Sequence, residues 1–492
     1  MSVKRSFEIN PNTSTNEDPK KLSRVGDSEM EVAWTSCEKD RGFDHHTVRE
    51  ESEYEGCIEL SKKSRNMTRN GTPVGDPVAS RASSKSHYKF ASHAYGVRML
   101  SKDLSNTKID LQVENIMIVN KQDDLSLVYL ARELVQWLLT NYNKLNVYVQ
   151  DNLQNSKHFD AQSIAKDSQC KESRIKYWDL DFLDQNVGFF DLIITLGGDG
   201  TVLFVSSIFQ THVPPVLPFA LGSLGFLTNF QFEYFKEDLP LILNQKIKTN
   251  LRMRLECKVF RRQEPILNPR TGKKICINEL ESEHHVLNEL TIDRGISPFI
   301  SMLEVYGDKS LLTVAQADGL IVATPTGSTA YSLSAGGSLV YPSVNAISVT
   351  PICPHTLSFR PIILPDSMNI RVKVSAKSRG TAWAAFDGKN RVELRPGDYI
   401  LISASPYAFP TLEATSTEFI DSISRSLNWN VREQQKSFSN VLCKKNLEQF
   451  ENVQLQDKEE SVEEVEVDNR LENSATKGIE MVQIDEPRND GL

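Results

Sequence analysis

The sequence lacks the cysteine spacing of a zinc site or of a disulfide framework. Its 7 cysteines are odd in number and scattered, and none forms a Cys-x-x-Cys pair. This usage is typical of reduced thiols, so we predict a cytoplasmic protein without a metal held by its own side chains. The amino-terminal residues also lack the apolar stretch of a secretory signal, and their acidic residues disfavour a transit peptide.

Long apolar runs and basic patches are scarce as well. The two uncharged runs, residues 213–232 and 319–359, contain prolines, glycines and hydroxyl residues. They therefore indicate buried strands and turns rather than membrane spans. Because no basic patch is interleaved with aromatic residues, we expect neither a nucleic acid nor a membrane as a partner.

Both ends of the chain are poor in periodic apolar runs. Residues 1–95 are rich in serine, asparagine, lysine and glutamate, which leaves little surface to bury. From Glu451 to Leu492 there are 13 acidic and 4 basic residues, a net charge of -9 that equals the charge of the whole chain. We predict a disordered amino-terminal arm over 1–95 and an acidic disordered tail over 441–492.

The next segment alternates strands with helices and predicts an α/β domain over residues 96–250 with a parallel sheet. An amphipathic helix is expected from Leu125 to Thr140, with Asp124 as its N-cap. The other expected elements are strands at 115–119, 145–149, 192–196 and 216–220, and a helix at 235–243.

After residue 250 the pattern changes to short β-like runs. A mainly β domain is predicted over 251–410, followed by a segment over 411–440 that packs back on the α/β domain and contains a helix at 417–429. The basic stretch 261–274 contains two prolines and a glycine, which favours a solvated hairpin loop over a phosphate clamp. The expected strands are 254–260, 286–292, 301–306, 320–323, 369–374 and 399–404.

A glycine-rich turn from Gly197 to Thr201 carries a single carboxylate, that of Asp199. Glycines let backbone amides approach a ligand closely, and a helix that begins near Thr201 aims its positive end at phosphate oxygens. The turn also lies at the carboxyl end of a parallel strand, where ligands collect. We interpret it as a candidate phosphoryl-transfer site. The alternative is a tight turn in which Asp199 satisfies local amides.

The segment from Asp318 to Gly337 is crowded with hydroxyls and backbone amides around one aromatic ring. Tyr331 can pack on a base, while Thr329 and Ser334 can bond the edges of that base or a phosphate. Such a segment suits a polar, planar ligand. A surface turn rich in glycine and serine is the alternative.

A third segment contributes an amide and a carboxylate side by side. Asn288 can donate to and accept from an adenine edge, and Glu289 can accept from both hydroxyls of a ribose. The preceding His284 and His285 are interpreted as structural, because neighbours in a strand point to opposite faces and do not converge on a metal.

Together these motifs make the chain similar to the NAD kinase family, and its low-complexity ends resemble fungal cytosolic members most. The resemblance spans about residues 110–430 and includes the runs Leu221–Asn229 and Pro354–Pro361. The glycine turn also occurs in diacylglycerol-type lipid kinases and in phosphofructokinases. However, the run Thr324–Tyr331 and the Asn288-Glu289 pair do not accompany it there.

The resemblance implies a two-domain NAD kinase-like fold and the ATP-dependent phosphorylation of the adenosine-ribose 2′-hydroxyl of NAD, with NADH as a further candidate. It implies ATP with Mg²⁺, small-molecule partners and a homo-oligomer. By position, Asp199 matches the proton acceptor. The residues that match contacts to the dinucleotide or its phosphates are Gly198, Gly200, Thr201, Asn288, Glu289, Asp318, Thr329, Ala330, Tyr331, Ser334 and Asp387.

Two departures and two alternatives stay open. Gln316 stands where bacterial members often carry an arginine, and Lys389 follows the downstream Asp-Gly pair, so contacts at these positions are not assigned. A kinase that acts on a lipid hydroxyl would need an apolar groove in place of the hydroxyl-rich segment. A dinucleotide-sensing module would need Asn288, Glu289 and Tyr331 but not Asp199.

Overall fold

The structure, a computed structural model, describes residues 30–36, 54–62, 95–429, 443–450 and 453. Short gaps in this description fall at 102, 105–106, 122–123, 169–171 and 223. The chain divides into two units, Met1–Leu427 and Asn428–Leu492. In the second unit residues 444–450 form a helix, so the prediction of a disordered tail from residue 441 is wrong for that helix. The other residues of the predicted tail, except 443 and 453, lie outside the described part.

Parallel strands form the middle of the first sheet, as predicted. Their order is β6–β5–β4–β7–β8, and almost every residue of the inner strands is buried, as expected for a sheet covered on both faces. The strands are β4 (Asn115–Asn120), β5 (Asn146–Gln150), β6 (Ile175–Trp178), β7 (Leu192–Gly197) and β8 (Val216–Ala220).

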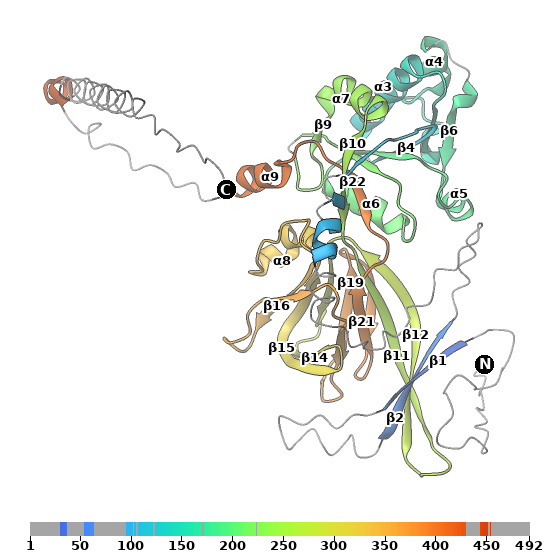
Figure 1. Cartoon of the computed structure of the whole chain (residues 1–492), viewed down its shortest axis with the longest axis vertical. Coiled ribbons are helices and arrows are strands. Elements are labelled where there is room, and N and C mark those ends of the chain that lie inside the picture. Colours follow the sequence, from blue (N-terminus) through green and yellow to red (C-terminus); the bar gives the residue numbers. More distant parts are fainter. Residues whose placement is uncertain are drawn as a thin grey trace, which may run out of the picture. The chain divides into compact units, whose positions relative to one another are not determined.

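Helices cover both faces of this sheet because successive strand residues point to opposite sides. Ile116 and Ile118 of β4 pack in one apolar cluster with α3, α4 and α7, whereas Met117 and Val119 pack in another with α5 and α6 (Figure 1). The predicted N-cap is present, since Asp124 accepts a hydrogen bond from the Ser126 amide at 3.0 Å. The helices are α3 (Leu125–Asn141), α4 (Ala161–Asp167), α5 (Leu180–Gln185), α6 (Asp199–Ile208) and α7 (Phe235–Asn244).

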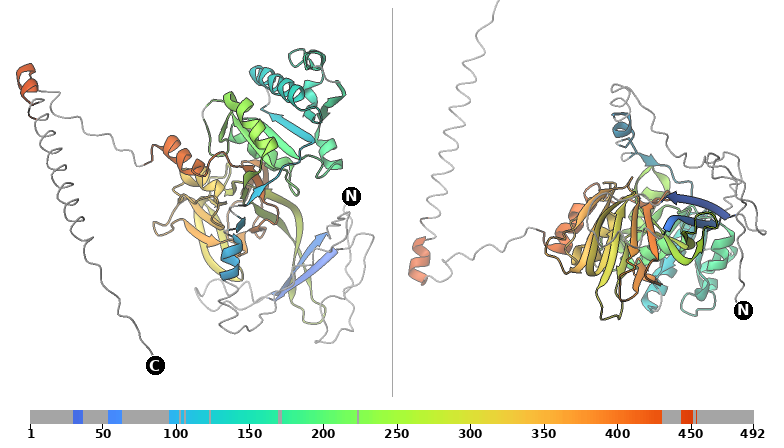
Figure 2. Two further views of the ribbon diagram at one scale, coloured as in Figure 1. Left: turned by 45° about the horizontal axis from the view of Figure 1, so that its top comes forward. Right: turned by 90° about the horizontal axis from the view of Figure 1, so that it is seen from below.

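The second sheet is almost entirely antiparallel, and its strands form the yellow and orange body in Figure 2. It encloses its own apolar cluster, so the predicted class of an α/β domain plus a mainly β domain is confirmed. Its strands are β11 (Leu255–Leu267), β12 (Lys274–Val286), β13 (Glu289–Asp293), β14 (Ser301–Gly307), β15 (Ser310–Ala323), β16 (Ala346–Pro354), β17 (Ile362–Pro365), β18 (Ile370–Val374), β19 (Ala382–Phe386), β20 (Lys389–Leu394) and β21 (Tyr399–Ala404).

The basic stretch 261–274 corrects the predicted hairpin loop. β11 stays paired with β12 as far as Leu267, and only residues 268–273 form the turn. Pro265 lies in a register shift between Gln263 and Ile266, where the ladder does not need its missing amide. The proline marked an irregularity in the ladder rather than the end of the strand.

Two strands lie within the predicted disordered arm. β1 (Met30–Ser36) pairs antiparallel with β2 (Tyr54–Lys62), and β2 pairs parallel with the edge of β12. The Tyr399 hydroxyl donates to Glu59 Oε1 at 2.5 Å. The arm prediction is therefore wrong at these two strands, because an open sheet edge can bind a short strand that average composition does not reveal. The rest of residues 1–94 lies outside the described part.

After the β domain the chain returns to the first sheet. β22 (Phe409–Leu412) pairs antiparallel with β10 (Ile247–Arg252) and parallel with β8. The next helix, α9 (Glu418–Leu427), contacts the α/β domain, where the Ser422 hydroxyl donates to the Gly225 carbonyl at 3.4 Å. The second domain is thus inserted between two neighbouring strands of the first.

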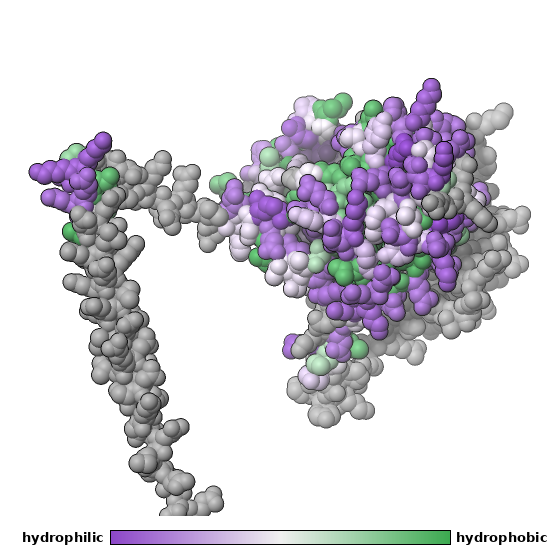
Figure 3. All heavy atoms as spheres, turned by 90° about the horizontal axis from the view of Figure 1, so that it is seen from above, coloured by the Kyte–Doolittle hydropathy of each residue, from purple (hydrophilic) through white to green (hydrophobic). Residues whose placement is uncertain are grey.

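None of the helices among the described residues is long and apolar enough to cross a membrane. In Figure 3 hydrophilic residues cover most of the described surface, and the hydrophobic residues form small groups among them.

The buried face of α3 provides a stability test. Leu134 is fully buried in the first apolar cluster, so Leu134→Ala should lower the free energy of unfolding by about 2–5 kcal/mol, measured by urea denaturation. Leu125 lies in the same helix and is 54% exposed, so Leu125→Ala should change it by only about 0.5 kcal/mol. Equal losses in the two variants would contradict the assigned packing.

Candidate active site

The glycine turn lies between β7 and α6, as the sequence predicts, and Asp199 is the first helical residue. A Cβ atom added at Gly197 would lie 2.3 Å from Thr201 Oγ1, so this position accepts only glycine. Among the residues that the structure describes, none lies within 4 Å of a Cβ atom added at Gly198 or Gly200, and no side chain caps the first turn of the helix. The helix amino terminus is therefore open to a ligand.

The carboxylate of Asp199 holds a loop that follows β8. It accepts hydrogen bonds from the amides of Phe226 and Leu227 and from the Thr228 hydroxyl, at 3.0, 3.1 and 3.1 Å. A Cβ atom at Gly225 would lie 2.1 Å from Asp199 Oδ1, so the loop can approach only because of this glycine. The carboxylate has about four lone-pair positions, and three are used here. The remaining position can accept one further proton donor.

A second carboxylate, that of Asp387, shapes the backbone around Asn288. It accepts from the amides of Leu287, Asn288 and Glu289 at 2.9, 2.8 and 3.1 Å. Burial raises the pKa of Asp387, although these amides and the charge of Arg254 oppose the shift. The sequence predicts Asp387 as a ligand contact, whereas here both of its oxygens bind this backbone. We call residues 287–289 the dinucleotide shelf, after the ligand that the sequence predicts for Asn288 and Glu289.

The side chains of the dinucleotide shelf have unused polar atoms. Asn288 and Glu289 are each 8% exposed, and Asn288 Oδ1 and Glu289 Oε2 are buried without a hydrogen-bond partner among the described residues. Burial, together with the neighbouring Asp387 charge, raises the pKa of Glu289 to about 8. Buried polar atoms are normally paired, so this arrangement indicates a polar ligand.

The loop after β15 is joined directly to the shelf. The Thr324 hydroxyl donates to the Leu287 carbonyl at 2.5 Å, and the Thr324 amide donates to the Asn288 carbonyl at 2.9 Å. A Cβ atom at Gly327 would lie 2.1 Å from the Asn288 carbonyl oxygen. Any other residue at Gly327 would therefore displace the shelf.

Several hydroxyls of this loop serve its own structure rather than a ligand. Thr329 Oγ1 donates to the Thr326 carbonyl at 3.0 Å, and Ser332 and Thr350 share a hydrogen bond of 2.9 Å. Thr329 was predicted to bond a base or a phosphate, and its hydroxyl now has only acceptor capacity left. Ser334 is exposed.

Tyr331 lies close to the other predicted residues. The residue is 44% exposed, and its pKa is raised, first by burial and then by the charges of Asp293, Cys353, Asp318 and Glu289. Asp318 forms an ion pair with Arg294 at 2.9 Å. Ala330 joins the short helices η4 (Thr326–Thr329) and α8 (Tyr331–Ser334). Tyr331 thus lies within electrostatic reach of Asp318 and Glu289, and Glu289 within reach of Asp387.

Two family models match consecutive parts of this chain. The ATP-NAD kinase N-terminal domain matches residues 116–247, and the ATP-NAD kinase C-terminal domain matches residues 287–414. The chain belongs to the ATP-NAD kinase family. The resemblance expected from the motifs is therefore confirmed.

Curated and solved relatives of this NAD kinase agree with the family models. The NAD(+) kinase of Saccharomyces cerevisiae is 64% identical over 409 residues, which cover 83% of this chain and 77% of that protein. The ATP-NADH kinase YEF1 of the same organism is 60% identical over 357 residues, 73% of this chain and 72% of that protein. The crystal structure of yeast NADH kinase complexed with NADH is similar with a TM-score of 0.56 at 33% identity, covering 67% of this chain and 91% of that chain.

Sequence reasoning missed a buried arginine at the junction of the two domains. Arg252 donates to the hydroxyls of Thr411 and Thr326 at 3.0 and 3.5 Å, and it lies 3.9 Å from Glu418. Burial lowers its pKa, whereas the charges of Glu418 and Asp199 raise it. The sequence does contain a signal, because Arg252 and Arg254 alternate with apolar residues at the predicted domain boundary. Burial of a charge costs free energy unless the charge is paired, so such arginines indicate specific partners.

Among the described residues, Asp199 belongs to no group of three side chains that could hold a metal ion. Such a group is formed by Glu256, Glu283 and His285, whose ligand atoms lie within 4.8 Å of one another. Lys258 already lies 2.8 Å from Glu256 and 3.9 Å from Glu283, so its ammonium balances this cluster. Any Mg²⁺ near Asp199 would therefore depend mainly on oxygens of a bound phosphate.

The raised pKa of Glu289 predicts a pH dependence of stability. Between its ordinary pKa of 4.5 and about 8, the folded protein keeps a proton that the unfolded chain has lost. The free energy of unfolding contributed by this group therefore falls as the pH rises through that window. Between pH 5 and pH 8, the free energy of unfolding measured by urea denaturation should fall by about 2–4 kcal/mol more in the wild type than in Glu289→Gln. Parallel stability curves for the two proteins would contradict the assigned burial.

Proposed function

We propose that this chain transfers the γ-phosphoryl group of ATP to the 2′-hydroxyl of the adenosine ribose of NAD, giving NADP, and that NADH serves as a further acceptor. The observation that carries the proposal is the arrangement of the two carboxylate-bound segments around one apolar cluster. Leu227, whose amide binds Asp199, and Leu287, which begins the dinucleotide shelf, belong to this same cluster. The candidate base and the candidate acceptor site are therefore built on one core.

The shelf provides the groups that an adenosine needs. Asn288 Oδ1 can accept from the amino group of adenine, and Glu289 can hydrogen-bond the ribose hydroxyls. The exposed ring of Tyr331 is available to pack on the base. In this proposal Asp318, Thr329, Ala330 and Ser334 complete the dinucleotide pocket.

Asp199 acts by position first. Three hydrogen bonds fix the orientation of its carboxylate, so its free lone pair can hold the 2′-hydroxyl in line with the γ-phosphorus. As the oxygen–phosphorus bond forms and the bond to ADP breaks, the hydroxyl proton passes to Asp199. The carboxylate need not be a strong base, because the proton moves late in a loose transition state.

The phosphates of ATP bind at the amino terminus of α6, where Gly198 and Gly200 leave space and Thr201 lies in the first turn of the helix. Mg²⁺ enters with ATP and offsets the charge of its phosphates. Lys389, the residue that departs from the family pattern, begins β20. Its ammonium lies 5.2 Å from the centre of the Phe204 ring, and Phe204 belongs to α6, so a cation lies beside this helix.

One assay separates this function from its alternatives. The protein is incubated with Mg-ATP and either NAD or NADH, and the product is detected with an NADP-specific dehydrogenase. A lipid kinase would form no such product. A dinucleotide-sensing module would bind NAD tightly under the same conditions and still form none.

Replacement of the candidate base gives a direct prediction. Asp199→Asn should leave NAD binding largely intact and lower kcat by at least about 100-fold, since the amide cannot take the proton. A matched control is Asp191→Asn, because Asp191 lies just before β7 whereas Asp199 lies just after it. Asp191 also binds backbone, since it accepts from the amides of Glu114 and Asn115 at 2.9 and 2.8 Å. This control should reduce stability but retain turnover. Near-normal kcat in Asp199→Asn would refute the assigned role.

We propose in addition that the protein works as a cytoplasmic homo-oligomer. Among the described residues, Cys257, Cys353 and Cys443 have free thiols, which supports a reducing compartment. Among the described strands β17 pairs only with β16, and its Ile362 and Ile363 are 47% and 50% exposed. An apolar edge strand is a ready surface for another copy of the chain.

The double variant Ile362→Lys/Ile363→Lys should therefore lower the molecular mass measured by light scattering. Leu180→Lys changes a residue of α5 that is 58% exposed, and it should leave the mass unchanged. An unchanged mass in the double variant would exclude β17 as the interface.

A further inference from the structure

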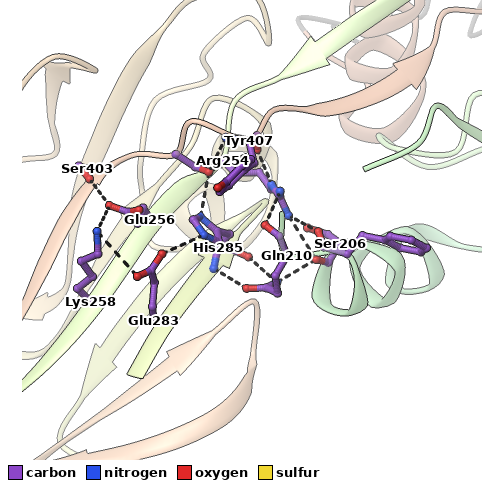
Figure 4. A network of polar contacts seen from close by, with 11 residues as sticks. Ser206, Gln210, Arg254, Glu256, Lys258, Glu283, His285, Ser403 and Tyr407 are labelled. Carbon is purple, nitrogen blue, oxygen red and sulfur yellow. Dashed lines mark hydrogen bonds and ion pairs between the residues drawn. The ribbon is translucent and has the colours of Figure 1, made fainter. Parts of the chain in front are cut away.

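Arg254 connects the carboxyl end of α6 to the second domain by hydrogen bonds. It is fully buried and lies between β10 and β11. Its guanidinium donates to the carbonyls of Phe209 and Gln210 at 2.8 and 2.9 Å, and to the Tyr407 carbonyl at 2.8 Å (Figure 4). The first two carbonyls follow the helix that begins with Asp199, and the third follows β21. One side chain thus joins a helix of the first domain to both connections between the domains.

Gln210 makes a second bridge at the same end of the helix. Its Oε1 accepts from the His285 amide at 2.8 Å, and its Nε2 donates to the His285 carbonyl at 3.2 Å and to the Ser206 carbonyl at 3.0 Å (Figure 4). The side chain therefore pairs with the backbone of β12 as a neighbouring strand would. His285 lies near the end of β12, two residues before the dinucleotide shelf, so this bridge holds the strand that leads into the shelf.

Apolar packing holds one face of α6, where Val202 and Val205 are buried in the cluster that also contains Leu287. Another face borders an open cleft of about 210 Å³ between α6, β12 and the β19–β20 hairpin, and Leu203, Ser207, Phe386 and Lys389 are among its lining residues. A face that borders a cleft makes fewer van der Waals contacts than a packed one. The directional hydrogen bonds of Arg254 and Gln210 add a constraint on the helix beside this cleft.

The charge of Arg254 also acts on both sides of the domain boundary. Burial lowers its pKa to about 10, and the Asp387 charge opposes the shift, so the guanidinium stays charged at neutral pH. Its positive charge faces helix carbonyls, which carry the negative end of the helix dipole. It also lies within electrostatic reach of the carboxylate that binds the shelf amides.

We propose that Arg254 and Gln210 form an interdomain latch that positions Asp199 against the dinucleotide shelf. This inference rests on the proposed function. α6 behaves as a rod of about 15 Å, so a tilt at its latched end displaces Asp199 at the other end. Neither latch residue touches the reacting atoms, and both are positioning residues. A displacement of about 1 Å in such a site costs on the order of 100-fold in rate.

A matched arginine allows structural and positional effects to be separated. Arg174 donates to the carbonyls of Leu145 and Leu139 at 2.9 and 3.2 Å, and also to that of Tyr142. The chemistry is the same as at Arg254, but all three acceptors lie within the first domain. Arg174→Met should therefore lower stability without moving Asp199 relative to the shelf.

The experiment compares four full-length variants, Arg254→Met, Arg254→Lys, Gln210→Ala and Arg174→Met, by steady-state kinetics with NAD varied at saturating Mg-ATP. Thermal unfolding followed by circular dichroism identifies a temperature at which all the proteins are folded, and the kinetics are measured at that temperature. We expect kcat to fall at least about 10-fold in Arg254→Met and Gln210→Ala, with KM for NAD within about twofold of wild type. Arg254→Lys keeps a donor and should recover part of kcat. Arg174→Met should retain the wild-type kcat.

Unchanged kcat in Gln210→Ala, or an equal loss of kcat in Arg174→Met, would overturn the latch. If Arg254→Met does not fold, Gln210→Ala and Arg254→Lys decide the question by the same criteria. Failure of the latch alone leaves NADP formation by the wild type intact. A wild type that forms no NADP contradicts the proposed function itself and, with it, the latch.

Discussion

The candidate site depends on aspartate carboxylates that each bind consecutive backbone amides of a distant segment. Asp387 fixes the amides of residues 287–289, and Asp199 fixes those of Phe226 and Leu227. A carboxylate bonded by several amides is held more rigidly than one bonded by flexible side chains, because backbone donors cannot rotate away. Since the shelf backbone is already satisfied, the side chains of Asn288 and Glu289 keep their own polar atoms for a ligand.

Glycine makes these carboxylate contacts possible. Gly225 brings its loop against Asp199, and Gly327 brings the loop after β15 against Asn288. In both places an added Cβ atom would overlap an oxygen of the site. The glycines of this site therefore serve two different purposes, since Gly198 and Gly200 leave room for a ligand whereas Gly225 and Gly327 permit close packing within the protein.

Much of the fold could be predicted because local sequence decides it. The buried parallel strands, the helix capped by Asp124 and the glycine turn follow from apolar periodicity, capping chemistry and glycine spacing. The pairing of β1 with β2 and of β2 with β12 could not, because a sheet edge selects its partner by backbone bonds rather than by composition. Likewise, Asp387 and Arg254 are ordinary charged residues in the sequence, and only the tertiary arrangement shows which amides and carbonyls they bind.

The connections between the two sheets have a consequence for how this protein could be rebuilt. The amide of Ser405 donates to the carbonyl of Arg254 at 2.9 Å, so the second domain begins and ends at adjacent backbone positions. Such a module can be exchanged at one pair of neighbouring chain ends, provided that its edge strand still accepts β2. Gene fusion at this point could supply a different acceptor pocket to the same phosphoryl-transfer scaffold, without any redesign of the parallel sheet.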